Sequence, residues 1–166
     1  MKFWQKTTKT TRKSLERIAG MAIDFNTRDE PDLRSEQECF PDVDSGVEIL
    51  GDRVLVQLRR EKTTSKGGII LVDETKQTLR FNETVAKVID IGPLAYKSPD
   101  DLTPWPEGPW CNVGDLVRTI KYGGDRFVVQ PDDDGAAVVF ITLQAREVIS
   151  KIKSFEYAQR MKAFVD

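Results

Sequence analysis

The chain has 166 residues, of which 31% are charged and 39% are hydrophobic, and its formal net charge is −2. This length suits one domain with a real core, and the near-neutral charge argues against a nucleic acid or an anionic membrane as the partner. Histidine is absent, which excludes Ser-His-Asp and Cys-His catalysis and histidine-containing zinc sites.

The first 46 residues are expected to form an arm and a linker. Residues 1–13 are basic and rich in threonine, without the apolar region that follows the basic start of a secretion signal. Residues 14–22 carry apolar side chains at helical spacing, which predicts a short amphipathic helix. Residues 24–46 are acidic and rich in turn formers, as linkers are. Disorder and a docking role both stay open for this arm.

A strand followed by a polar run begins at Gly51. Residues 52–58 alternate so that Val54 and Val56 face one way and Leu55 the other, which predicts a β-strand. The next run, residues 59–66, contains no hydrophobic side chain and is rich in charges and hydroxyls. A run with no apolar face to bury is typical of a mobile loop.

An apolar group follows the polar run. Gly67 and Gly68 lead into Ile69, Ile70 and Leu71, and polar residues lie on both sides. By pattern alone these three side chains fit an ordinary buried strand. Their polar surroundings instead favour an exposed plug that binds in a groove of another protein.

The order and spacing of these pieces resemble the N-terminal half of the GroES-like co-chaperonins. The resemblance covers roughly residues 51–152. It implies an all-β fold, a small irregular β-barrel, and a mobile loop whose plug binds an ATP-driven chaperonin ring (GroEL-like). It implies neither a cofactor nor any chemistry of the subunit's own. The family usually has a glycine where the loop returns to the next strand, and Phe81, Asn82 and Glu83 occupy that place here.

A proline-rich segment follows the second strand. Residues 83–91 alternate as a strand does, and Gly92 and Pro93 end it. The resemblance places a roof loop over the ring in the segment that runs to residue 112. We expect Trp105 and Trp110 to cap one end of the barrel rather than to bind a partner, because large aromatic side chains are rarely left exposed.

Short strands fill the remainder of the matched region. Val113, Gly114 and Asp115 form a turn before an apolar strand, which is a second family match, and further strands alternate with turns up to residue 152. The resemblance pairs the last strand with the first strand of a neighbouring subunit, closing a ring of seven. The subunit interface is therefore expected to include Val54, Val56, Val148, Ile149 and Ile152.

The remaining motifs of the sequence do not indicate a metal site or an enzyme. Asp132 opens an acidic turn, but the twelfth residue from it is Leu143, where a calcium-binding EF-hand needs glutamate. Cys39 and Cys111 fit no metal spacing, and two free thiols in a reducing cytosol are favoured over a disulfide. No carboxylates pair at a catalytic spacing, so no enzyme, metal or cofactor is expected.

The expected organisation is an arm at 1–46, a GroES-like barrel at 47–152 and a C-terminal extension at 153–166 whose apolar spacing predicts a helix. Two functions are compatible with it. One is a cytoplasmic co-chaperonin whose ring caps a chaperonin and assists protein folding, without nucleic acid or membrane. The other is a structural oligomer subunit that contacts neighbouring virion proteins, which the long arm and the extension favour. A phage-encoded co-chaperonin would combine both origins.

Overall fold

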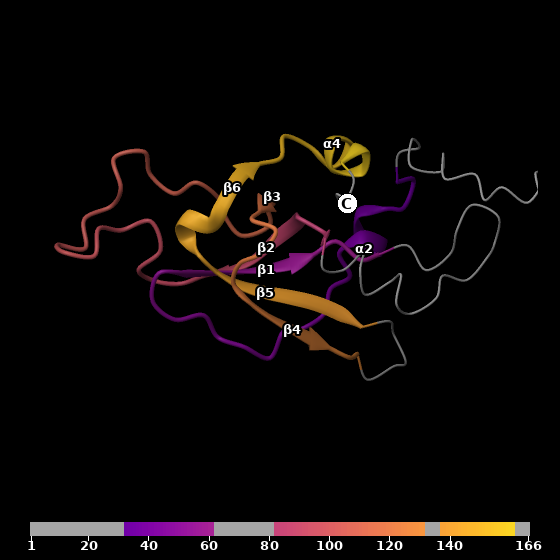
Figure 1. The fold of residues 1–166 in the computed structure, drawn as a ribbon, viewed down its shortest axis with the longest axis horizontal. Coiled ribbons are helices and arrows are strands. Elements are labelled where there is room, and N and C mark those ends of the chain that lie inside the picture. The colour runs from indigo at the N-terminus through magenta and orange to yellow at the C-terminus, as the bar shows by residue number, and fades with distance from the viewer. Residues whose placement is uncertain (1–31, 62–81, 132–136, 162–166) are drawn as a thin grey trace, which may run out of the picture. The chain divides into compact units, whose positions relative to one another are not determined.

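A computed structural model describes residues 32–61, 82–131 and 137–161 (Figure 1). The chain divides into two compact units, Met1–Glu30 and Pro31–Asp166, and all described residues belong to the second. They form an antiparallel sheet with the strand order β4-β5-β1-β2-β3-β6. Its elements are α2 (Glu36–Cys39), β1 (Arg53–Leu58), β2 (Val85–Ile91), β3 (Leu116–Thr119), β4 (Asp125–Val129), β5 (Val138–Gln144), η2 (Ala145–Glu147), β6 (Val148–Lys151) and α4 (Phe155–Arg160).

The all-β prediction is confirmed, and the sheet is open rather than closed. In the described part of the chain, β4 and β6 are its two edges and no ladder joins them. The helix expected near the C-terminus is present as α4. No helix within the described ranges is long and apolar enough to cross a membrane. The division of the chain at residues 46 and 152 stays a prediction.

β1 lies near the centre of the sheet because both of its faces are apolar. Every side chain from Val54 to Leu58 is buried, whereas a strand with one solvated face would expose alternate residues. Val54 belongs to the largest core cluster, with residues of β2, β3 and β5. Leu55 points to the other side, where it packs with Ile49 and Phe140. Residues ahead of β1 thus cover the face that would otherwise meet water.

The first and last described segments pack together beside the sheet. α2 begins at a capping box, in which Ser35 Oγ accepts from the Glu38 N–H at 3.2 Å and Glu38 Oε2 accepts from the Ser35 N–H at 2.6 Å. Cys39 and Phe40 then pack against Ala158 of α4 and against residues of β2 and β3. Residues 32–40, expected to be part of a linker, therefore contribute to the core.

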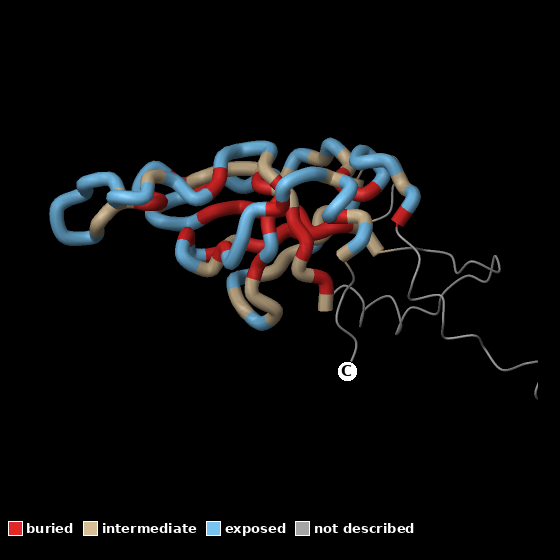
Figure 2. Tube along the Cα trace, turned by 90° about the horizontal axis from the view of Figure 1, so that it is seen from above, coloured by how far each residue is buried: buried red, intermediate tan, exposed pale blue. Residues whose placement is uncertain are grey.

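The segment between β2 and β3 extends from the sheet on the side opposite α2 and α4 (Figure 1). Much of it is exposed, as the pale blue stretch at the left of Figure 2 shows. It occupies the place at which the resemblance puts the roof loop. Ala95, Tyr96 and Cys111 are its buried members in the largest core cluster.

Candidate functional site

The predicted partner-binding residues lie outside the described residues, between residues 61 and 82. They are Gly67, Gly68, Ile69, Ile70 and Leu71. The structure describes both ends of this interval. β1 leads into it and β2 follows it, and the two strands pair antiparallel as far as Leu58 and Ala86. The Arg59 N–H donates to the Val85 carbonyl at 2.9 Å, so the chain leaves the sheet and returns to it at adjacent strand ends.

A buried ion pair joins these two strand ends. Arg59 Nη2 and Nε donate to Glu83 Oε2 at 2.8 and 3.0 Å. The two side chains are only 7% and 9% exposed. Glu83 Oε1 accepts from the N–H groups of Thr84 and Val85 at 3.0 and 2.8 Å. Four donors thus satisfy the carboxylate, which offsets the cost of burying its charge. The sequence analysis placed Arg59 in a solvated run, and the structure shows that this placement is wrong.

The five predicted interface residues are not equally accessible. Val54, Val56 and Val148 lie in the largest core cluster of their own subunit, and Ile152 is buried in the second cluster. Ile149 is 57% exposed. β1 is paired with β2 on one side and β5 on the other, whereas β6 ends the sheet beside β3. Among these five residues, Ile149 is the one whose side chain is placed to meet a neighbour, and the interface itself stays a prediction.

An aromatic cluster lies in the segment between β2 and β3. The rings of Trp105 and Trp110 are 5.1 Å apart, and those of Tyr96 and Trp105 are 5.5 Å apart, both edge to face. Trp105 packs against the largest core cluster, as expected for a cap. Trp110 stays 39% exposed, and its Nε1 donates to Glu107 Oε2 at 3.0 Å. Trp105, Pro106, Glu107 and Trp110 line a pocket of about 220 Å³.

Both cysteines are free and buried. Burial raises the pKa of Cys39 to about 11, because the thiolate would lose its hydration. Burial also raises the pKa of Tyr96, and a 2.9 Å hydrogen bond between its hydroxyl and Cys111 Sγ adds to the shift. Reactivity requires the thiolate, so Cys39 is inert in the folded chain.

These shifts predict a loss of stability at alkaline pH. The thiol of Cys39 ionises near its ordinary pKa of 9.0 in the unfolded chain but only near 11 in the folded one. Above pH 9 the unfolded state therefore binds fewer protons, and the free energy of unfolding falls as the pH rises towards 11. Denaturant titrations across this range should show the decline, and Cys39→Ala should make it shallower. An equal decline in both proteins would contradict the assignment to Cys39.

The described residues contain no cluster of three or more histidine, cysteine, aspartate or glutamate side chains that could hold a metal ion. The buried pair of Arg59 and Glu83 holds two strand ends together. The arrangement defines a small antiparallel β protein with long connections after β1 and after β2.

A model of the family described as "Chaperonin 10 Kd subunit" matches residues 46–152, and the chain belongs to this family. Two relatives named "Co-chaperonin GroES" show the extent of the similarity. The protein from Chlamydia pneumoniae is 31% identical over 107 residues, which cover 64% of this chain and 91% of the relative. The protein from Chlamydia felis is 30% identical over 104 residues, covering 63% and 88%. The resemblance deduced from the motifs is thereby confirmed.

Proposed function

We propose that this chain is a co-chaperonin subunit whose ring caps an ATP-driven chaperonin in the cytoplasm and assists protein folding. The observation that carries the proposal is the family match over residues 46–152, together with relatives named co-chaperonin GroES. The contact with the chaperonin is made by Ile69, Ile70 and Leu71, and Gly67 and Gly68 let the backbone adopt the docked turn. The subunit binds no cofactor and catalyses no reaction.

The energetics favour many weak contacts over one strong contact. Burying an Ile or Leu side chain contributes about 1.5–3 kcal/mol, so three of them supply about 5–9 kcal/mol for each subunit. Ordering the backbone opposes this at about 1–2 kcal/mol for each residue fixed. A single subunit therefore binds weakly, while a ring binds tightly because the remaining contacts form at high local concentration. Weak individual contacts also let the ring dissociate when the apolar groove of the chaperonin changes shape during its ATP cycle.

The ring is proposed to form through β6, with seven subunits as the resemblance implies. The support is that β6 is an edge strand and that Ile149 on it is 57% exposed. An edge strand with unpaired backbone groups is a template for another chain. Val54, Val56, Val148 and Ile152 would support this edge from inside the subunit. Native mass spectrometry of the purified protein should give seven times the chain mass of 18.8 kDa.

Replacing Ile70 with aspartate tests the proposal. The ring mass should be unchanged, and the affinity for a chaperonin ring in ATP or ADP should fall by at least about tenfold for each contact, because an apolar group is replaced by a charge that must be desolvated. Thr64→Asp is the matched control, since it adds the same charge to the polar run. Binding should be measured by titration of the full-length ring. If Ile70→Asp instead unfolds the subunit, Ile70 belongs to its own core and the proposal fails.

The second candidate is a structural subunit of a viral particle that reuses this fold. The described residues on either side of the family match, 32–45 and 153–161, favour it because they extend the relatives' domain at both ends. The packing of these flanking residues argues against a viral structural subunit, since Phe40 and Ala158 are buried within their own subunit rather than presented to a neighbour. Co-elution with a chaperonin ring in nucleotide would select the co-chaperonin; incorporation into particles without such binding would select the alternative.

A further inference from the structure

We propose that the segments 32–40 and 155–161 together form a clamp that fixes both ends of the interval 62–81 and thereby raises its affinity for the chaperonin. The inference rests on the proposed function of that interval. Both segments lie outside the residues that the family model matches. The clamp is therefore an addition of this chain to the shared domain, and it meets that domain at the ends of the predicted binding segment.

The first half of the clamp holds the backbone that leaves β1. Arg34 Nη1 donates to the Glu61 carbonyl at 3.0 Å, and Nη2 donates to the Arg60 carbonyl at 2.7 Å. Asp32 orients this guanidinium, with Oδ2 2.7 Å from Nη2 and Oδ1 3.0 Å from Nε. The Arg60 N–H donates to the Cys39 carbonyl at 2.9 Å. Residues 60 and 61 are thus held at three backbone groups.

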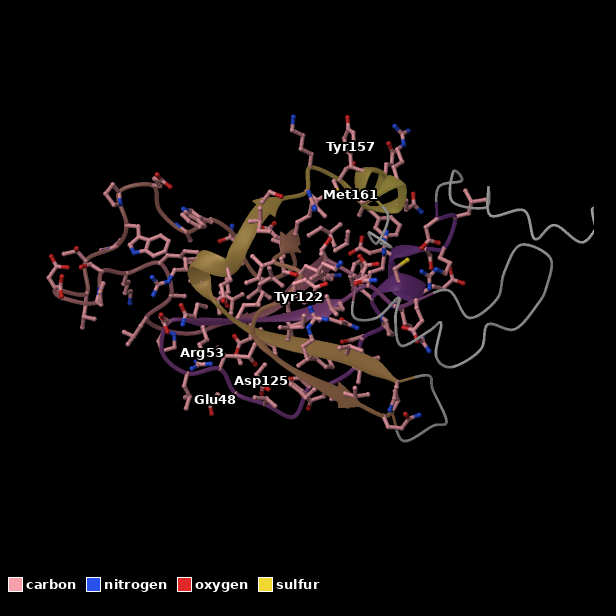
Figure 3. The ribbon with its side chains drawn as sticks, viewed as in Figure 1. Glu48, Arg53, Tyr122, Asp125, Tyr157 and Met161 are labelled. Carbon is pink, nitrogen blue, oxygen red and sulfur yellow. The ribbon has the colours of Figure 1, made fainter. Side chains whose placement is uncertain are left out.

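The second half of the clamp holds both strand ends through Arg59. Arg59 Nη1 donates to the Ala158 carbonyl at 2.6 Å, and Nη2 donates to the Met161 carbonyl at 2.8 Å. These carbonyls lie at the C-terminal end of α4, where the Ala158 carbonyl also accepts from the Met161 N–H at 3.2 Å. Figure 3 shows Met161 on the side of α4 that faces the sheet and Tyr157 pointing away from it. Because Arg59 also binds Glu83, α4 is connected to the strand that returns as well as to the strand that leaves.

The two halves are bonded to each other. The Asp32 N–H donates to the Gln159 carbonyl at 2.9 Å, and Gln159 Nε2 donates to the Arg34 carbonyl at 2.9 Å. Beneath these bonds, Phe40 and Ala158 share one buried cluster. The clamp is therefore a single packed unit, and loosening one half is expected to loosen the other.

Such a clamp favours binding by reducing the number of residues that docking must order. Each backbone residue that becomes ordered only when the segment docks lowers the affinity for the chaperonin by roughly tenfold. Residues 59–61 and 83–84 are fixed at folding, so their ordering does not oppose binding. Arg34 and Arg59 act as positioning residues, because they would change affinity without touching the chaperonin.

The experiment uses the full-length ring with Arg34→Met. The native mass should stay that of the unchanged protein. The unfolding midpoint should fall, because the change removes the Arg34 cation from the Asp32 carboxylate, whose side chain is 6% exposed. In the folded ring the Arg60 amide should exchange hydrogen faster, and the affinity for the chaperonin should fall about tenfold or more. Arg34→Lys should not restore the affinity, because an ammonium cannot reproduce the fork that binds two carbonyls and a carboxylate. The control is Arg160→Met, which removes an exposed arginine at the end of α4.

Two results would overturn the clamp. One is faster exchange at Arg60 with unchanged chaperonin affinity, and the other is unchanged exchange at Arg60. If Arg34→Met does not fold, Gln159→Ala removes a single side-chain bond between the two halves and is judged by the same readouts. Failure of the proposed function can be distinguished from failure of the clamp. If the proposed function is wrong, Ile70→Asp leaves the chaperonin affinity unchanged, regardless of the result for Arg34→Met.

Discussion

Replacing Arg59 with methionine should lower the free energy of unfolding by about 3–5 kcal/mol, because the change leaves the buried carboxylate of Glu83 without its cation. The carbonyls of Ala158 and Met161 lose the arginine as a donor in the same step, although Ala158 keeps its bond from the Met161 N–H. Methionine roughly fills the space of the arginine stem, so the loss reports mainly on charge and hydrogen bonding. Urea unfolding of the full chain measures it.

The double variant Arg59→Met with Glu83→Gln provides the internal control for this prediction. Glutamine keeps an acceptor for the N–H groups of Thr84 and Val85 but carries no charge to desolvate. We expect the double variant to be more stable than Arg59→Met alone, since the two side chains are coupled. Equal stability of the two variants would show that Glu83 is hydrated, which would contradict its burial.

Replacing Phe40 with alanine should destabilise the subunit by about 3–5 kcal/mol, the usual cost of deleting a buried aromatic ring. Phe40 is only 4% exposed and packs with Cys39, Ala158 and Ile152. The matched control is Leu33→Ala, which removes an apolar side chain that is 87% exposed in the same segment. That change should stay within about 0.5 kcal/mol.

A small effect of Phe40→Ala would mean that residues 32–40 are a linker after all, as their composition suggested. Denaturant titration distinguishes the two outcomes, and near-ultraviolet circular dichroism reports whether the packing around the ring has changed. The result bears on the clamp as well, because the same cluster connects α2 to α4.

The strands were predictable because their signals are local. Alternation from Val54 to Leu58, the break at Gly92 and the turn before Leu116 each lie within a few residues of the element they define. The family resemblance supplied the order of these elements. It also implied a small irregular β-barrel, and the ladders of the described residues form a sheet that is not closed.

The clamp was not predictable in the same way, because its partners are distant in sequence. Arg59 binds Glu83 across 24 positions and Ala158 across 99. A charged residue next to a polar run looks solvated until those partners are known. One local signal does indicate part of the clamp: Ser35 followed by Glu38 is a capping-box pattern that indicates a helix start inside the acidic stretch.

The sequence also could not predict which of the expected interface residues are buried inside their own subunit. A pattern of valines and isoleucines indicates which side chains avoid water, but it cannot tell the interior of one subunit from the contact between two. Val56 and Ile149 looked equivalent on that basis. The structure separates them, because β1 lies inside the sheet and β6 lies at its edge.

The pairing of Arg59 with α4 has a consequence for biosynthesis. Arg59 precedes Ala158 by 99 positions and Met161 by 102 positions, so a ribosome makes the guanidinium long before its two carbonyl acceptors exist. Until α4 has been made, α2 has no helix to pack against. The ladders β1–β2 and β2–β3 join strands that are made well before α4, whereas the ends of the proposed chaperonin-binding segment are fixed by Arg59 only once α4 has formed.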